Sequence, residues 1–181
     1  MRPVYAKAFQ HLLTLSIVGN GIINLILSMY SKQQVSQIRH EFWTAFGQYM
    51  APVPSAEGEK INWVNYKTGV KHIYFKMEAD QQFASIEIAL THPALDSQKL
   101  YFDHLLQFKN LLHDTQDEEW MWALHVTVDG KVMSRIFTEL ASANIFNTEH
   151  WPALISFFKQ RLIMLDEFWS QVRHGMDVVE R

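Results

Sequence analysis

Three acidic residues and a lysine in the middle of the chain are of the types that bind a divalent metal ion and activate water. Glu78 and Asp80 lie at the end of one predicted strand, and Glu87 lies within the next. Carboxylates suit Mg²⁺ because it is a hard cation, and bound Mg²⁺ makes water a better nucleophile. Lys76, on the polar face of the neighbouring strand, could steady the developing charge. The candidate catalytic residues are therefore Glu78, Asp80, Glu87 and Lys76, with Glu87 and Asp80 as metal ligands.

These residues match a nuclease pattern only in part. The predicted order of a helix, three strands, a helix and a strand is also that of the PD-(D/E)XK nucleases. In that fold an acid near the second strand and a Glu-x-Lys on the third bind the metal. Here Glu87-Ile88-Ala89 has alanine where the lysine belongs. A divalent-metal nuclease with a degenerate motif and a degenerate restriction-endonuclease-like core is therefore an alternative. Mg²⁺ is implied only under it, and whether the chain is an enzyme stays open.

A second candidate site would bind a ligand without reacting with it. Its residues are Asn65, Tyr66, Lys67, His72, Tyr74 and Lys76. Because side chains alternate along a strand, the last three share one predicted sheet face with Ser85 and Glu87. Aromatic and basic groups on an open sheet can stack on bases and contact phosphate. The alternatives are that a helix covers this face or that its polar groups simply face water.

Hydrophobic periodicity predicts the elements that position both sites. Helices are predicted over residues 31–50, from 96 or 97 to about 113, and from 147 or 148 to about 174. Strands are predicted over 61–66, 70–78, 83–91, 119–128 and 131–137, the last two joined by the hairpin signal Asp129-Gly130. Short turns make the first three strands an antiparallel meander. We therefore expect one α+β domain over residues 29–181, with about five antiparallel strands and three main helices in the order helix-βββ-helix-ββ-helix.

Composition narrows the classes of function. The chain has no cysteine, which excludes disulfides and cysteine-based metal sites. With a formal net charge of −3, the chain lacks the overall positive charge of a typical nucleic-acid binder. A local basic patch is still compatible with this charge. The histidines show no zinc-binding spacing, and no glycine-rich phosphate loop is present.

The amino-terminal residues 1–28 form an apolar extension. Residues 8–31 contain no charged side chain, and this uncharged stretch is long enough for a membrane helix. However, Gly19, Asn20, Gly21 and Asn24 lie at its centre, where polar groups are most costly in lipid. We therefore expect translation to begin at Met29 and the protein to be cytoplasmic, with a membrane span disfavoured. The alternatives are a membrane-associated helix through residues 8–31, a packed helix or a secretion signal.

Several separated motifs resemble one bacterial family of uncharacterised proteins, the domain of unknown function numbered 4268. The motifs are INWVNYKTG, ASIEIALTH, EEWMWALHV and WPALISFFKQRLIMLDEFW, and the resemblance covers roughly residues 30–173. The family carries no established activity, but some members are joined to or placed near nuclease-like modules. By that association the resemblance implies an intracellular accessory domain that binds a partner, either nucleic acid or a nuclease-containing protein.

Overall fold

The computed structural model describes residues 32–116 and 118–178. The chain divides into two compact units, Met1–His40 and Glu41–Arg181. The predicted extension (1–28), the apolar run at 8–31 and the expected start at Met29 lie outside the described residues. None of the helices in the described ranges is long and apolar enough to cross a membrane.

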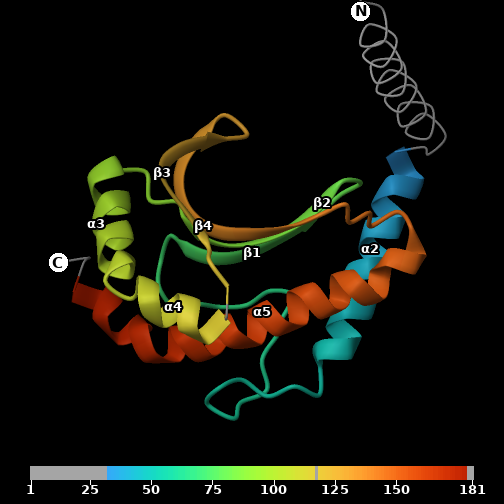
Figure 1. Ribbon diagram of the computed structural model, residues 1–181, viewed down its shortest axis with the longest axis horizontal. Coiled ribbons are helices and arrows are strands. Elements are labelled where there is room, and N and C mark those ends of the chain that lie inside the picture. The colour runs from blue at the N-terminus through green and yellow to red at the C-terminus, as the bar shows by residue number, and fades with distance from the viewer. Residues whose placement is uncertain (1–31, 117, 179–181) are drawn as a thin grey trace, which may run out of the picture. The chain divides into compact units, whose positions relative to one another are not determined.

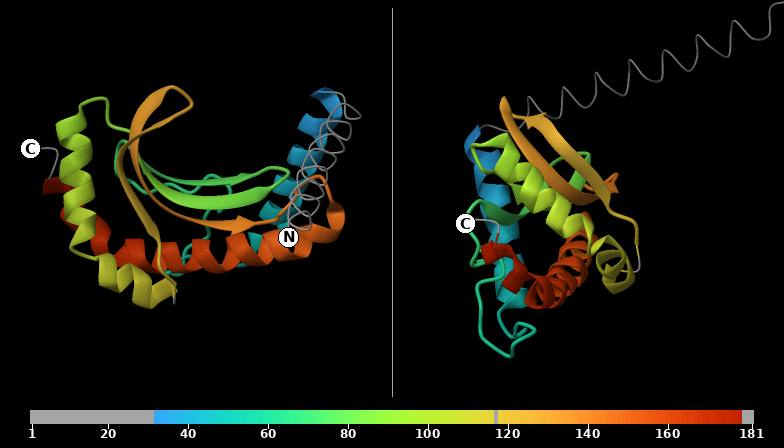
Figure 2. Two further views of the ribbon diagram at one scale, coloured as in Figure 1. Left: turned by 45° about the horizontal axis from the view of Figure 1, so that its top comes forward. Right: turned by 90° about the vertical axis from the view of Figure 1, so that its left-hand side faces the viewer.

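The second unit contains one curved antiparallel sheet of four strands, which confirms the predicted α+β class (Figure 1). The strands are β1 (Ile73–Ala79), β2 (Phe83–Leu90), β3 (Met121–Val128) and β4 (Lys131–Ala141), in the order β1-β2-β4-β3. The helices are α2 (Lys32–Met50), α3 (Leu95–Leu106), α4 (Lys109–Gln116) and α5 (Trp151–Val172), with short 3-10 helices η1 (Thr148–His150) and η2 (Arg173–Val178). Both views in Figure 2 place α5 along the convex side of the sheet and none of α3, α4 and α5 over its concave side.

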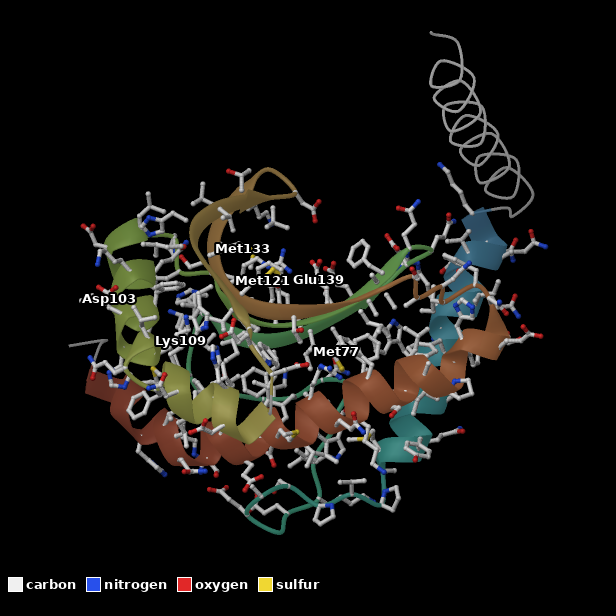
Figure 3. All side chains as sticks on the ribbon, in the orientation of Figure 1. Met77, Asp103, Lys109, Met121, Met133 and Glu139 are labelled. Carbon is white, nitrogen blue, oxygen red and sulfur yellow. The ribbon has the colours of Figure 1, made fainter. Side chains whose placement is uncertain are left out.

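The convex face of the sheet carries the hydrophobic core. Its side chains come from alternate positions of the strands, among them Ile73, Ile86, Ile88, Leu90 and Ile136, all fully buried. Aromatic rings continue the core between helices, where Phe42 and Phe46 of α2 pack on Phe158 of α5. Figure 3 shows Met77 between the sheet and α5, and Met121, Met133 and Glu139 on the opposite, concave side. The alternation predicted for β1 and β2 therefore places their apolar residues correctly.

The predicted strand at residues 61–66 is wrong, so the sheet has four strands rather than about five. Side chains satisfy the backbone here in place of a neighbouring strand. The Asn62 side-chain oxygen accepts hydrogen bonds from the backbone N–H groups of Val64 and Asn65, which folds the chain into a turn. Trp63 is buried and donates its indole N–H to the carbonyl of Val53.

Two further expectations differ from the structure. The predicted three-stranded meander is reduced to the antiparallel pair β1–β2, because residues 61–66 form no strand, and β2 pairs with β4 on its other side. The helix predicted from 96 or 97 to about 113 is two helices, α3 and α4. Between them Gln107 and Phe108 donate to the carbonyls of His104 and Leu105, hydrogen bonds of the tighter i+3 type that end α3. The hairpin around Asp129-Gly130 and the last helix are confirmed.

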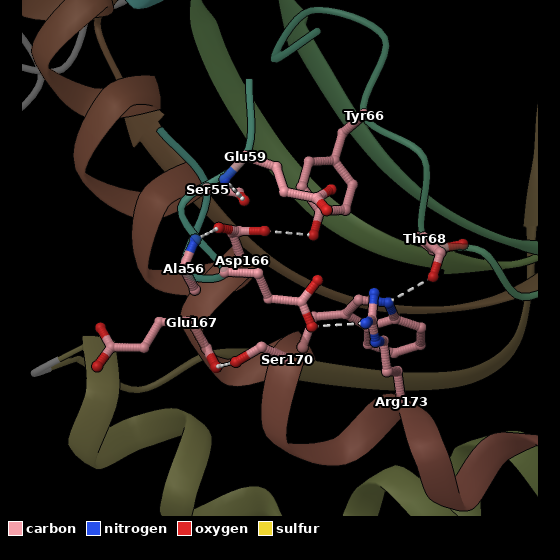
Figure 4. A network of polar contacts seen from close by, with 11 residues as sticks. Ser55, Ala56, Glu59, Tyr66, Thr68, Asp166, Glu167, Ser170 and Arg173 are labelled. Carbon is pink, nitrogen blue, oxygen red and sulfur yellow. Dashed lines mark hydrogen bonds and ion pairs between the residues drawn. The ribbon is translucent and has the colours of Figure 1, made fainter. Parts of the chain in front are cut away.

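Asp166 of α5 holds the irregular segment 51–72 against the helix (Figure 4). Its carboxylate accepts a hydrogen bond from the Tyr66 hydroxyl at 2.5 Å and another from the backbone N–H of Ala56 at 2.5 Å. Asp166 is only 5% exposed, so both bonds lie in a poorly hydrated environment. Burial and the hydrogen bond to Asp166 raise the pKa of Tyr66 well above its ordinary value, so the hydroxyl stays a donor.

Two further side chains, Trp169 of α5 and Arg173 of η2, also bind the irregular segment. The indole N–H of Trp169 donates to the carbonyl of Thr68 at 2.7 Å, and Arg173 donates to Glu57 at 2.6 Å. Positions 166, 169 and 173 are three and four residues apart, which places them on one helix face. The segment without regular structure is therefore anchored at several points along its length.

We expect Asp166→Ala to lower the free energy of unfolding by about 2–3 kcal/mol, because a buried polar group that loses its partner costs about 1–3 kcal/mol. Tyr66→Phe should cost about 1 kcal/mol, since it removes one hydrogen bond. Glu167→Ala, a change of the exposed neighbouring acid, is the matched control. Urea unfolding measures all three, and equal effects of Asp166→Ala and Glu167→Ala would show that the attachment contributes nothing.

Candidate functional site

The concave face of the sheet contains a cavity of about 670 Å³. Its lining comes from β1, β2, β4 and the β3–β4 turn, and consists of Tyr74, Lys76, Glu78, Glu87, Thr91, Val128, Asp129, Lys131, Val132, Met133 and Arg135. The cavity opens on the polar face of the β1–β2 hairpin. Figure 2 shows none of α3, α4 and α5 over that face.

Glu87, at the centre of β2, is the buried charge of this cavity. It is 7% exposed, and one basic side chain from each adjacent strand, Lys76 of β1 and Arg135 of β4, supplies opposite charge. Glu87 Oε2 lies 2.6 Å from Arg135 Nε, and Glu87 Oε1 lies 3.8 Å from Lys76 Nζ. The strand register produces the second contact, since Lys76 is directly opposite Glu87. A buried carboxylate is costly unless it is paired, so this arrangement makes Glu87 tolerable.

Arg135 keeps unused hydrogen-bonding capacity. Its guanidinium carbon lies 3.9 Å from the centroid of the Phe137 ring, which orients the group by a cation–π contact. Although Nε is close to Glu87, the approach is not aligned for a hydrogen bond. Within the part of the chain that the structure describes, no protein group accepts from the two terminal nitrogens. Arg135 is therefore an oriented cation that can still bind a carboxylate or a phosphate.

The cavity balances its charges and has an apolar rim. Lys76, Lys131 and Arg135 are its cations, and Glu78, Glu87 and Asp129 are its acids. Two large side chains of the lining are close to half exposed, Tyr74 at 47% and Val132 at 45%. A ligand here meets charges of both signs next to aromatic and aliphatic surface.

The predicted catalytic residues do not form one cluster. Lys76, Glu78 and Glu87 lie on the concave face, but Asp80 lies in the β1–β2 turn, where its side chain accepts from the N–H groups of Gln82 and Phe83. Among residues 32–116 and 118–178, no three histidine, aspartate or glutamate side chains are grouped so as to hold a metal ion.

The predicted binding residues divide between the two sides of the sheet. Tyr74 and Lys76 line the concave cavity, whereas Asn65, Tyr66 and Lys67 line a second cavity of about 410 Å³ next to Asp166 and Arg173. The Tyr66 ring stacks on Phe75, whose centroid is 4.7 Å away, and Phe75 belongs to the core side.

His72 precedes β1 and lines neither cavity. Its φ is +64°, and its ring contacts that of His92 with centroids 4.7 Å apart. The carbonyl of His72 accepts from the backbone N–H of Thr91 at 2.8 Å. His72 therefore closes the open end of the β1–β2 hairpin.

Sequence reasoning missed Arg135, Lys131 and Asp129. Alternation in KVMSRIF places Arg135 on the same face as Met133 and Phe137, so a signal existed. Its meeting with Glu87 depends on the pairing of β4 with β2, which juxtaposes residues 48 positions apart and leaves no local pattern.

Comparison with known proteins identifies one family. Residues 38–173 match the family described as Domain of unknown function (DUF4268), as the motifs predicted. No curated protein and no solved structure matches the chain.

Glu87 should couple stability to pH. Burial is the main cause that raises the pKa of Glu87, although Arg135 and Lys76 oppose it. The folded protein then binds this proton more tightly than the unfolded chain does. As the pH falls from neutral toward about 4.3, the ordinary pKa of glutamate, the unfolding free energy of the native chain should rise relative to that of Glu87→Gln. Urea unfolding across this range measures the difference, and a change in the opposite direction would contradict the raised pKa.

Proposed function

Because the chain belongs to the DUF4268 family, whose description assigns no function, we propose a function from the geometry of the cavity: the domain binds a polypeptide partner on its concave face. An acidic side chain or a chain-terminal carboxylate of that partner pairs with Arg135. Lys76 and Lys131 lie in the same lining and add positive charge around this carboxylate.

The main support for this proposal is that the Arg135 guanidinium is held in place but, in the described part of the chain, still has free hydrogen-bond donors. It is oriented by Phe137 and Glu87, yet its terminal N–H groups have no acceptor among the described residues. A guanidinium presents its donors as a planar fork that matches both oxygens of a carboxylate. Orientation in the free protein reduces the entropy that a partner must offset on binding.

The surroundings of Arg135 favour a polypeptide over a polyanion. The lining holds as many acidic as basic side chains, and the whole chain carries a formal charge of −3, so there is no excess of positive charge for repeated phosphates. Aromatic residues, methionine and arginine are the side chains enriched at protein interfaces. Exposed Tyr74 and Met121 on the concave side, together with Arg135, fit that composition.

Single-stranded nucleic acid is the second candidate, and one observation favours it. The Tyr74 ring is exposed two residues from Lys76 on the same face, an arrangement that stacks a base and contacts a phosphate. Binding of this kind weakens steeply as salt is added. The metal-dependent nuclease has no comparable observation in its favour, since Glu87 is engaged by Arg135 and Lys76.

Nuclear magnetic resonance titration of the labelled full chain separates the two candidates. The probes are an acetylated decapeptide of alternating glutamate and tyrosine, and a decamer of thymidine. We expect the peptide to shift the amide signals of Lys76, Glu87 and Lys131. Arg135→Gln should weaken peptide binding about tenfold, because a hydrogen bond to a charged group contributes about 1.5–3 kcal/mol.

Two other variants keep this test interpretable. Arg135→Lys retains the charge without the planar fork and should bind with intermediate affinity. Lys99→Ala removes an exposed α3 lysine outside the cavity lining and should leave binding unchanged. If the thymidine decamer but not the peptide shifts the amide signals of Lys76, Glu87 and Lys131, the partner is nucleic acid rather than a polypeptide. No Arg135-dependent shift with either probe would overturn the concave site.

A further inference from the structure

We propose that the free edge of β1 takes up an extended segment of the partner polypeptide as an added antiparallel strand. This inference rests on the proposed function, because it names how a polypeptide is held. It concerns different atoms, the backbone groups of Phe75 and Met77, and therefore has its own test.

The hydrogen-bond pattern identifies which groups of β1 face outward. Strand β1 is at the edge of the sheet, and among the described residues β2 is its only strand neighbour. At its two ends, Asp80 N–H donates to the Phe83 carbonyl at 3.0 Å, and Thr91 N–H donates to the His72 carbonyl at 2.8 Å. These are hydrogen-bonded pairs of the antiparallel register, and such pairs alternate along a strand.

It follows that the even-numbered residues of β1 direct their backbone groups toward β2. Tyr74, Lys76 and Glu78 belong to this set. The N–H and C=O groups of Phe75 and Met77 point the other way, to the free edge. Among the described residues no hydrogen bond satisfies these four outward groups. An edge with unpaired backbone groups is a template for another strand.

The preceding part of the same edge is already closed. The Thr68 hydroxyl donates to the carbonyl of Ile73 at 2.7 Å, and the Ile73 N–H donates to Val70 at 3.4 Å. The free stretch therefore begins at Phe75, and the strand that it accepts is short.

A hollow of about 330 Å³ lies beside this free stretch. Trp43 of α2 and Val64 line it together with β1 residues 75–78. A strand placed between a sheet edge and a helix gains affinity from backbone hydrogen bonds and specificity from the pockets for alternate side chains. The side chain opposite Met77 points to the core side, where Trp43 and Val64 provide apolar contact.

The charges of β1 specify the neighbours of that apolar residue. Lys76 and Glu78 face the concave side, and directly opposite residues of paired strands interact. An acid opposite Lys76 and a base opposite Glu78 are therefore favoured. In an antiparallel strand this reads base, apolar residue, acid from the amino to the carboxyl end. The partner is thus an extended segment of that pattern.

Amide hydrogen exchange of the full chain tests the proposal residue by residue. The probe is the peptide acetyl-Thr-Thr-Lys-Val-Glu-Thr-Thr-amide. We expect it to slow exchange at Phe75 and Met77 at least about tenfold, because only outward N–H groups gain a partner. Tyr74, Lys76 and Glu78 are already bonded to β2 and should change little.

Two matched peptides serve as controls. Exchanging the lysine and glutamate of the probe reverses the charge match, and methylating the valine nitrogen removes a backbone donor. Both should lose most of the protection. Equal protection by the charge-exchanged peptide would overturn the proposed pattern, and equal protection by the methylated peptide would overturn strand addition.

A pair of protein variants checks the same edge from the other side. Met77→Pro removes an outward N–H while leaving the ladder to β2, whereas Met77→Leu keeps the N–H and changes only the side chain. Peptide protection should be lost in the first and kept in the second. Because proline can also disturb the fold, retained protection at Lys76 and Glu78 is required of both variants.

The remaining outcomes separate this inference from the proposed function. Exchange at Phe75 and Met77 could already be slow without peptide, with the protein sedimenting as a dimer. That result would mean that a second copy of the chain occupies the edge, and it would overturn the proposal of a peptide partner at this edge. No protection of Phe75 and Met77, with the Arg135-dependent shifts intact, would overturn strand addition and leave the concave site standing.

Discussion

The burial of Glu87 in the middle of β2 is the constraint on which the arrangement of the concave face depends. Strand β2 is buried along almost its whole length and lies between β1 and β4, so a carboxylate at this position requires opposite charge from these two strands. Arg135 of β4 and Lys76 of β1 provide that charge. Pairing Glu87 therefore places two cations in the cavity, and the lining is thereby prepared to bind an anionic group.

The opposite side of the sheet meets the same requirement with different partners. Asp166 is also buried, but its carboxylate accepts hydrogen bonds from two neutral donors, a tyrosine hydroxyl and a backbone N–H. Those bonds fasten an irregular segment to α5 and leave no oriented cation free. The comparison explains why one buried carboxylate accompanies a candidate binding face and the other an anchoring contact.

Local patterns in the sequence predicted the parts of the fold that local physics determines. Alternation placed Tyr74, Lys76 and Glu87 on one face of the sheet, and Asp129-Gly130 marked the β3–β4 turn. The strand predicted at 61–66 was wrong, because the Asn62 side chain folds this stretch into a turn and the buried Trp63 bonds to Val53. The Glu87–Arg135 pair could not be predicted, since it requires knowing that β2 lies beside β4.

We propose that Arg135 binds a carboxylate of a polypeptide partner. A double-mutant cycle tests it most directly, combining Arg135→Gln in the protein with glutamate-to-glutamine changes in the acidic peptide and measuring each affinity by calorimetry. We expect a coupling free energy of about 1–3 kcal/mol for one glutamate, within the range for groups in direct contact. Additive effects at every glutamate would contradict it.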